Sequence, residues 1–432
     1  MFLKLKIFKY LLIYRFRKEF KTREALETWQ NKKIKKHLKR VVKKSSFYSE
    51  RLQKYNSWTA FPIINKKIFM DNFDAINTHG IEKEAAFEVA IKGEQTRNFS
   101  PMIKNITIGL SSGTSGNRGI FMVSIKERAQ WVAYVVLNLL GFKFKKRKIA
   151  FFLRANSNLY TSAKSRLIDF NFFDLKKPLK ENILSLNKYN PDILIAQPSM
   201  LREIAKAQQE KTINIKPSKI ISVAEVLEPI DHSLLKRTFN QVIHQAYQCT
   251  EGFLAKTCRY GTLHFNEDLV KIEQHFLDSN KDRYHPIITD FTRSSQPIFR
   301  YELNDIIIDK QAPCPCGSIF KAIDHIEGRS DDTFVLESRD GKSVNIFPDF
   351  IRRTIIITCK NIKEYIVEQS GDKEITIYLD SQNFESAKTL LEEAFINLLK
   401  HYNVDDCSLI FKPEVPICNT SKLRRVKRNI KQ

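Results

Sequence analysis

The pattern of apolar and polar positions divides the chain into a helical beginning, an alternating middle and a smaller final part. Residues 1–60 carry Lys and Arg among Leu, Ile and Phe at helical spacing, which predicts basic helices that end near Phe61-Pro62. From about residue 100, short β-branched runs alternate with helical stretches, including a helix at 199–209, which is typical of an α/β architecture. The runs that predict strands are 106–110, 148–153, 192–196, 220–223, 287–291 and 306–309.

The pattern changes at the polar segment 328–332, which has the composition of a linker. Beyond it, the sequence predicts strands at 365–369, 374–379 and 408–411 and a helix at 385–401. We therefore expect three parts, a basic helical segment packed on a large domain, the large domain itself and a small α+β domain, with bounds 1–60, 61–329 and 330–432.

Composition narrows the class of protein. The chain has 432 residues, of which 42% are hydrophobic, and this is enough to bury the cores of two domains. Thirteen Gly and fourteen Pro exclude collagen-like and low-complexity disordered chains. The formal net charge is +24, but residues 1–54 hold 18 Lys and Arg against 4 Glu, and residues 421–432 add six basic residues and no acid. Because the remainder is nearly neutral, we expect no nucleic-acid partner, which would need a basic face on the folded body.

The first 20 residues leave two interpretations open. Lysines interrupt every apolar run and no small-residue cleavage site follows, so this segment is not expected to be a secretory signal. It could be a helix that docks its Phe and Leu side chains on the fold, or an amphipathic helix that makes a weak contact with an anionic membrane surface. Seven cysteines, an odd count, favour a reducing cytoplasm, with at most a peripheral position on the inner face of the membrane.

A glycine-rich turn is the most informative single segment. Ser111-Ser112-Gly113-Thr114-Ser115-Gly116-Asn117-Arg118-Gly119 follows a predicted strand and precedes another apolar run. Glycines permit tight turns, and clustered hydroxyls and backbone N–H groups can surround a polyphosphate. The spacing matches neither the P-loop of NTPases nor the dinucleotide-binding fingerprint. A plain surface turn of Ser and Gly remains the alternative.

Further motifs follow in order. They are Ser222-Val223-Ala224-Glu225, Tyr247-Gln248-Cys249-Thr250-Glu251, Arg300-Tyr301-Glu302-Leu303-Asn304-Asp305, Gly328-Arg329-Ser330-Asp331-Asp332 and Pro416 to Lys422. Together with the glycine-rich turn, they resemble the motifs of the adenylate-forming superfamily, which includes acyl-CoA synthetases, peptide-synthetase adenylation domains and luciferases. Within it, the chain is most similar to phenylacetate–CoA ligase relatives, near the capsule-associated and deazaflavin-adenylylating synthetases, so polysaccharide biosynthesis is one expected setting.

The resemblance implies an α/β fold with a large multi-sheet N-terminal domain and a small, mobile α+β C-terminal domain. It implies that a carboxylic acid attacks the α-phosphate of ATP to give acyl-adenylate and pyrophosphate, followed by transfer to CoA, a carrier protein or a glycan. The implied catalytic residues are Lys422, Glu251, as the ligand of Mg²⁺, and Thr250. The implied nucleotide-binding residues are Ser111, Ser112, Gly113, Thr114, Ser115, Gly116, Ala224, Glu225, Tyr247, Asp305 and Arg329, with Asp331 as the hinge between the domains.

The chain also departs from the family pattern. The phosphate loop is one residue short, with Arg118 where the family has Pro-Lys, and the segment before Lys422 lacks its usual Gly. These departures favour one alternative from another class, a catalytically weak nucleotide-binding sensor or partner module. The basic ends of the chain favour a second, a peripheral membrane-binding protein.

Four residues form a candidate metal site. Cys258, His264, Cys314 and Cys316 supply the three thiolates and one imidazole of a structural zinc centre. The Cys314-Pro-Cys316-Gly segment resembles a C-x-C-G motif of phenylacetate–CoA ligase relatives. Buried free cysteines in a reducing cell are the alternative.

Overall fold

The computed structural model describes residues 2–17, 19–98, 101–111, 118–141, 145–153, 165–359, 362–416 and 423–429. The chain forms two compact units. Unit 1 comprises Met1–Leu303 and Ile308–His325, and unit 2 comprises Asn304–Ile307 and Ile326–Gln432. The three-part division expected from the sequence stays a prediction.

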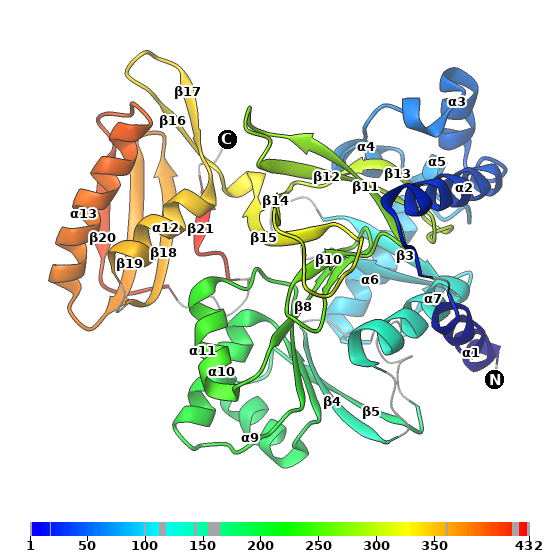
Figure 1. Ribbon diagram of the computed structural model, residues 1–432, viewed down its shortest axis with the longest axis horizontal. Helices are drawn as coiled ribbons and strands as arrows, with labels where there is room; N and C mark the ends of the chain where they lie inside the picture. Colours follow the sequence, from blue (N-terminus) through cyan, green and yellow to red (C-terminus); the bar gives the residue numbers. More distant parts are fainter. Residues whose placement is uncertain are drawn as a thin grey trace. The chain divides into compact units, whose positions relative to one another are not determined.

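Unit 1 begins with the predicted basic helices, α1 (Phe2–Arg15), α2 (Arg23–Val41) and α3 (Ser46–Tyr55), coloured dark to mid blue in Figure 1. Helix α2 starts at Thr22 because the Thr22 hydroxyl accepts a hydrogen bond from the backbone N–H of Ala25. Shorter elements follow, namely η1 (Trp58–Ala60), α4 (Lys66–Asp71), α5 (Phe73–Ile76) and α6 (Lys83–Thr96).

A small antiparallel sheet carries the glycine-rich turn. It consists of β1 (Met102–Ile103), β2 (Ile106–Leu110) and β3 (Ile120–Ser124), in that order. Its apolar face packs with α6 through Ala86, Ala90, Ile106, Ile120 and Met122. Helix α7 (Ile125–Val135) follows β3 directly and continues as a π-helical turn, Val136–Gly141.

The large sheet has the strand order β11-β12-β14-β15-β10-β9-β8-β7-β6-β4-β5, with β13 paired to β12. The strands β5, β4, β6, β7 and β8 run parallel, and β9 pairs antiparallel with both β8 and β10. Helices α9 (Leu179–Tyr189), α10 (Pro198–Gln209) and α11 (Pro229–Phe239) form one apolar core with the parallel strands (Figure 1). The strand bounds are β4 Arg147–Leu153, β5 Ile168–Asp174, β6 Ile193–Ala196, β7 Lys219–Val223, β8 Ile243–Gln248, β9 Phe253–Thr257, β10 Leu263–Phe265, β11 Val270–Phe276, β12 Arg283–Asp290, β13 Ile298–Glu302, β14 Asp305–Asp309 and β15 Ala322–Arg329.

Most predicted strands of the middle region are confirmed within one or two residues. Strand β6 is buried along its whole length, because both faces of a parallel sheet are covered, and a continuous apolar run marks such a strand. The segment 328–332, predicted as a linker, has regular structure, and its role between two domains stays a prediction. Gly328 and Arg329 are the last residues of β15, and Ser330–Asp332 form a 3₁₀ turn. Gly328 has φ +139°, a conformation open to glycine.

Unit 2 has a four-stranded sheet with the order β20-β19-β18-β21 and a separate hairpin of β16 (Phe334–Glu337) and β17 (Ser343–Ile346). Helices α12 (Pro348–Thr358) and α13 (Phe384–His401) share one apolar core with the strands. The remaining strands are β18 Ile362–Gly371, β19 Glu374–Ser381, β20 Ser408–Lys412 and β21 Val426–Arg428. The α+β character predicted for this part is confirmed.

Within the part of the chain that the structure describes, no helix combines the length and the apolar character needed to span a membrane.

Candidate active site

A shallow pocket in unit 1 is lined in part by Glu251, which follows β8. Its free space, including the part open to solvent, is about 260 Å³. The residues that line it are Lys66, Phe69, Met70, Gly119, Ile120, Thr250, Glu251, Arg293, Gln296, Ile298 and Tyr301. Two of these, Thr250 and Glu251, are residues that the sequence singled out.

Hydrogen bonds orient the Glu251 carboxylate. The Tyr301 hydroxyl donates to Oε1 at 3.0 Å, and the Thr250 hydroxyl donates to Oε2 at 2.7 Å. Burial of the ring and the neighbouring carboxylate raise the pKa of Tyr301 above its ordinary value, so the phenol keeps its proton and remains a donor. Each carboxylate oxygen has further lone pairs, which could bind a cation in the pocket.

Arg293 fixes the backbone beside Glu251. Its guanidinium donates to the carbonyl oxygen of Thr250 at 2.5 Å and to Oε1 of Gln296 at 2.9 Å. Gln296 in turn donates to the carbonyl of Ile120 and accepts from the N–H of Met122, at 2.9 and 3.2 Å. Because Ile120 and Met122 belong to β3, these bonds join the Thr250–Glu251 turn to the strand that follows the glycine-rich turn.

Glu127, in the first turn of α7, holds loop 292–296, which carries Arg293 and Gln296. Its carboxylate accepts from the backbone N–H groups of Ser294 and Ser295, and from the Ser295 hydroxyl at 2.5 Å. It also forms a capping box with Ser124. Burial alone would raise the pKa of Glu127, but the hydrogen bonds from Ser124 and Ser295 outweigh it and hold the pKa below its ordinary value. The carboxylate therefore stays ionised and keeps loop 292–296 in place.

The base of the glycine-rich turn is closed like a hairpin. Ser111 N–H donates to the carbonyl of Gly119, and Gly119 N–H donates to the Ser111 hydroxyl, each at 2.7 Å. Arg118 pairs with Glu94 at 2.6 Å. Ser112, Gly113, Thr114, Ser115 and Gly116 lie outside the described residues, as does Lys422.

The residues expected at the adenine ring lie at the ends of two parallel strands. Ala224 follows β7 with φ +69°, a left-handed conformation that is uncommon for alanine. Glu225 accepts a hydrogen bond from the N–H of Ser199 at 3.2 Å. Tyr247 is half-buried on β8, at an irregularity in its pairing with β9. None of the three lines the pocket around Glu251.

The residues expected at the ribose and the hinge come together in unit 2. The Nε of Arg329 lies 3.6 Å from Oδ1 of Asp305, so the two form an ion pair. Asn304 donates to Oδ2 of Asp331 at 3.0 Å, and its carbonyl accepts from the N–H of Ser330 at 2.8 Å. The two segments of unit 2 are thus bonded to each other at the point where the sequence placed a hinge.

The four predicted zinc ligands converge in unit 1. The ligand atoms of Cys258, His264, Cys314 and Cys316 all lie within 4.8 Å of one another. The sulfurs of Cys258 and Cys314 are 3.7 Å apart, and the sulfur of Cys316 is 3.4 Å from Nε2 of His264. The other ring nitrogen of His264, Nδ1, is 3.0 Å from the carbonyl of Phe320, which favours a tautomer with its free lone pair at Nε2.

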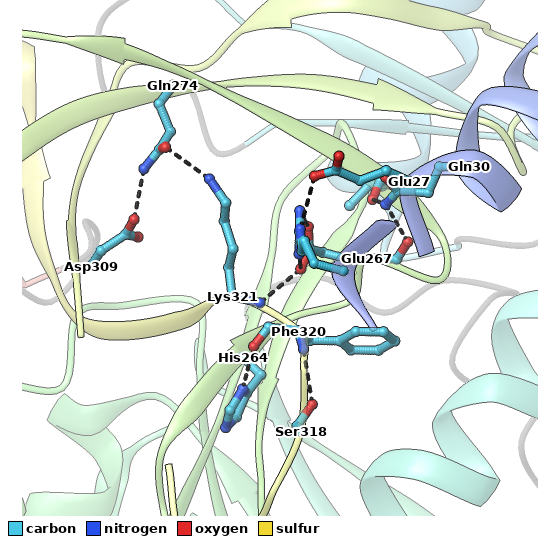
Figure 2. A network of polar contacts seen from close by, with 11 residues as sticks. Glu27, Gln30, His264, Glu267, Gln274, Asp309, Ser318, Phe320 and Lys321 are labelled. Carbon is cyan, nitrogen blue, oxygen red and sulfur yellow. Dashed lines mark hydrogen bonds and ion pairs between the residues drawn. The ribbon is translucent and has the colours of Figure 1, made fainter. Parts of the chain in front are cut away.

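A buried carboxylate joins the strand beside this cluster to the N-terminal helices (Figure 2). Glu267 has no exposed surface and accepts from both terminal nitrogens of Arg23 at 2.6 Å. It also accepts from the N–H of Lys321, next to Phe320, and its carbonyl accepts from the side chain of Gln30, at 2.7 and 2.6 Å. These bonds fix α2 to the segment that positions His264.

Sequence reasoning missed several residues of the pocket. Arg293, Gln296 and Glu127 fall in no motif that was recognised, and each is a single polar residue. Tyr301 lies in a recognised motif, yet nothing in its spacing indicated a contact with Glu251. The only sequence signal for Glu127 is the Ser124-x-x-Glu127 spacing of a capping box.

The chain resembles solved structures in fold. 2-Hydroxyisobutyryl-CoA ligase in the postadenylation state, in complex with 2-HIB-AMP, matches with a TM-score of 0.65 and 16% identity, over 94% of this chain and 89% of that chain. The same ligase with 2-HIB-AMP and CoA, in the thioesterification state, matches with a TM-score of 0.54 and 16% identity, over 95% and 91%. ATP-bound MatB from Rhodopseudomonas palustris matches with a TM-score of 0.50 and 15% identity, over 72% and 64%.

No family profile matches the sequence, and no curated protein matches it at a significant level. The structural likeness at low identity establishes the fold alone. The α/β class predicted from the sequence is confirmed, and the fold is like that of 2-hydroxyisobutyryl-CoA ligase.

Proposed function

We propose that this protein activates a small carboxylic acid with ATP, forming an acyl-adenylate and releasing pyrophosphate. The observation that carries the proposal is the oriented Glu251 carboxylate, held in a pocket beside the base of the glycine-rich turn, in a chain with the fold of adenylate-forming ligases. The resemblance of six ordered motifs supports it independently.

The chemistry explains the kinds of residue that are needed. Both reactants are anions, so the site must neutralise charge and hold them in line. Glu251 fits a Mg²⁺ ligand because its carboxylate is fixed by two donors and the residue lines the pocket. Bound Mg²⁺ would neutralise phosphate charge. Arg293 and Glu127 hold the turn at Thr250 and Glu251 in position relative to β3, and we assign them positioning roles.

The other predicted residues take their proposed roles from the motifs. Lys422 bridges the carboxylate and the α-phosphate, and Asp331 serves as the hinge. Asp305, whose charge is balanced by Arg329, accepts hydrogen bonds from the ribose. The residues proposed to contact the adenine and the phosphates are Ser111, Ser112, Gly113, Thr114, Ser115, Gly116, Ala224, Glu225 and Tyr247.

We propose CoA as the first acceptor to test, because one structural neighbour was solved with CoA and 2-HIB-AMP together. A carrier-protein thiol or a glycan hydroxyl would use the same acyl-adenylate.

We also propose one structural zinc at Cys258, His264, Cys314 and Cys316. Two sulfurs at about 2.3 Å from a tetrahedral zinc are separated by about 3.8 Å, and a sulfur and a ring nitrogen by about 3.5 Å. The measured separations of 3.7 and 3.4 Å agree with these values.

The test of the function is exchange of labelled pyrophosphate into ATP with a broad panel of carboxylic acids. We expect exchange with at least one acid, and a loss on the order of 100-fold in Glu251→Gln, since a fixed charge at the reacting phosphates is removed. Glu203→Gln, on the exposed side of α10, is the matched control and should retain full exchange. ATP binding without exchange for any acid would favour the nucleotide-binding sensor instead.

A further inference from the structure

Helix α1 is attached to unit 1 along one side. It lies beside α7 in Figure 1, and the Tyr14 ring meets the Tyr134 ring edge to face at a centroid distance of 5.3 Å. At its end, Arg17 donates to the carboxylate of Asp268 at 2.5 Å. The helix is therefore held in a defined orientation, and its two sides have different surroundings.

The outward side of α1 is apolar. Its large apolar side chains are exposed, with Leu5 61%, Phe8 60%, Leu12 44%, Ile13 47% and Phe16 79% exposed. Leu5, Phe8, Leu12 and Phe16 are separated by three or four residues, so they form one stripe along the helix. The inward positions are also apolar or aromatic, including Ile7, Tyr10 and Leu11. A helix that only docked on the fold would carry polar residues on this outward side.

Cations border this stripe. Lys4, Lys9 and Arg15 are exposed, and residues 2–17 contain no acidic side chain. Residues 1–54 together have a net charge of +14. Phe and Leu in a stripe edged by Lys and Arg match the composition of helices that lie in the interface of an anionic bilayer.

Charge decides which occupant fits the stripe. A second copy of this chain would bring its own Lys4, Lys9 and Arg15 against the same residues, and like charges would oppose the contact. Anionic lipid offers both an apolar layer for the stripe and phosphate groups for the cations.

We propose that α1 docks the protein on the surface of an anionic lipid bilayer. Leu5, Phe8, Leu12 and Phe16 enter the boundary between headgroups and acyl chains, and the flanking cations contact lipid phosphates. This contact is peripheral, and it does not depend on the adenylation that we propose.

The experiment measures co-sedimentation of the full chain with vesicles of phosphatidylglycerol and phosphatidylcholine, and with phosphatidylcholine alone. We expect binding to the anionic vesicles that weakens as salt is raised, with each neutralised cation of the face lowering affinity about fivefold. Phe8→Ser/Leu12→Ser should lower binding at least about tenfold, because both lost side chains are apolar groups that enter the bilayer. Lys9→Gln removes one cation without altering the apolar stripe, and it should lower the affinity for anionic vesicles about fivefold.

The matched control is Leu390→Ser/Ile396→Ser, on α13 of unit 2, where the side chains are 49% and 41% exposed in a helix of mixed charge. It should bind like the wild type, and thermal melting should confirm that all variants fold. The proposal is overturned if the wild type ignores anionic vesicles, or if it binds neutral vesicles equally well. It is also overturned if Phe8→Ser/Leu12→Ser leaves lipid binding intact. The same holds if the wild type binds no vesicles and this double variant instead loses self-association or the binding of an acidic protein.

Discussion

At the scale of single residues, two histidines of unit 1 have lowered pKa values. His37 on α2 is 4% exposed and stacks on the ring of Phe299. Burial lowers the pKa of His37 to about 4, because the cation would lose its hydration. His244, on β8, also has its pKa lowered to about 4 by burial.

We predict that the protein loses stability as the pH falls from about 6.5 toward 4. In the unfolded chain His37 has a pKa near 6.5. Between pH 6.5 and 4 the unfolded chain therefore binds a proton at His37 that the folded chain does not bind, so acid favours unfolding. At pH 5 this costs about 2 kcal/mol relative to pH 7.5. His37→Gln should show a smaller drop by that amount in denaturant unfolding, whereas His401→Gln, at an exposed position, should behave like the wild type. Equal drops in all three proteins would contradict the assignment.

The residues of the pocket differ in how far sequence could reveal them. Glu251 was found because its neighbours form a recognisable motif. Arg293 and Glu127 were not found, because their importance comes from long-range contacts, Arg293 with the Thr250 carbonyl and Glu127 with Ser294 and Ser295. A single polar residue that bonds to distant backbone carries no periodic signal in the sequence.

At the scale of elements, the Cys–His cluster joins two turns that are far apart in the chain. Cys258 follows β9, His264 lies on β10, and Cys314 and Cys316 lie between β14 and β15. Without a shared ligand, the second turn has little apolar surface of its own to hold it, since residues 311–313, 315, 317 and 318 are exposed.

We predict that protein purified without added metal contains close to one zinc per chain. Cys314→Ser should lower both the zinc content and the melting temperature, because removal of one thiolate opens the tetrahedral site. Cys407→Ser, in unit 2 and outside the cluster, is the control and should keep its zinc. Metal-free wild-type protein, or a melting temperature that Cys314→Ser leaves unchanged, would rule out the structural zinc.

Elements were predictable where one physical signal dominated. The buried run of β6 and the helical spacing of α13 place both elements within one residue of their observed bounds. The regular structure of segment 328–332 was not predicted, because its polar residues are paired within unit 2. Arg329 bonds to Asp305, and Asp331 to Asn304. Polar side chains indicate a loop only where they form hydrogen bonds with water. The sequence alone does not reveal whether their partner is water or another side chain.

At the scale of the whole molecule, the residues assigned to the proposed reaction are spread along the chain, with Glu251 far in sequence from Asp305 and Lys422. The kinetic effects of substitutions should therefore separate by role rather than by position in the chain.

We predict that Lys422→Ala lowers kcat for adenylate formation by about 100- to 1000-fold with little change in ATP affinity. Lys422 is assigned to charge that develops in the transition state. Asp305→Ala should instead weaken ATP binding, since ribose contacts are present before and during the reaction. Lys400→Ala, at an exposed position on α13, is the control. A wild-type rate in Lys422→Ala, measured by pyrophosphate exchange, would mean that the final basic segment is only a solvated run of charges.

The path of the chain between the two units limits how they can be recombined. It enters unit 2 at Asn304, returns to unit 1 at Ile308, and leaves again after His325. A chimaera spliced at one junction near residue 326 would therefore take its short 304–307 segment from one parent and the rest of unit 2 from the other. The Asp305–Arg329 and Asn304–Asp331 pairs would then have to match across parents. Grafting this unit onto another chain of the same fold requires two separate pieces of sequence, 304–307 and the part from 326 onward, to be transferred together.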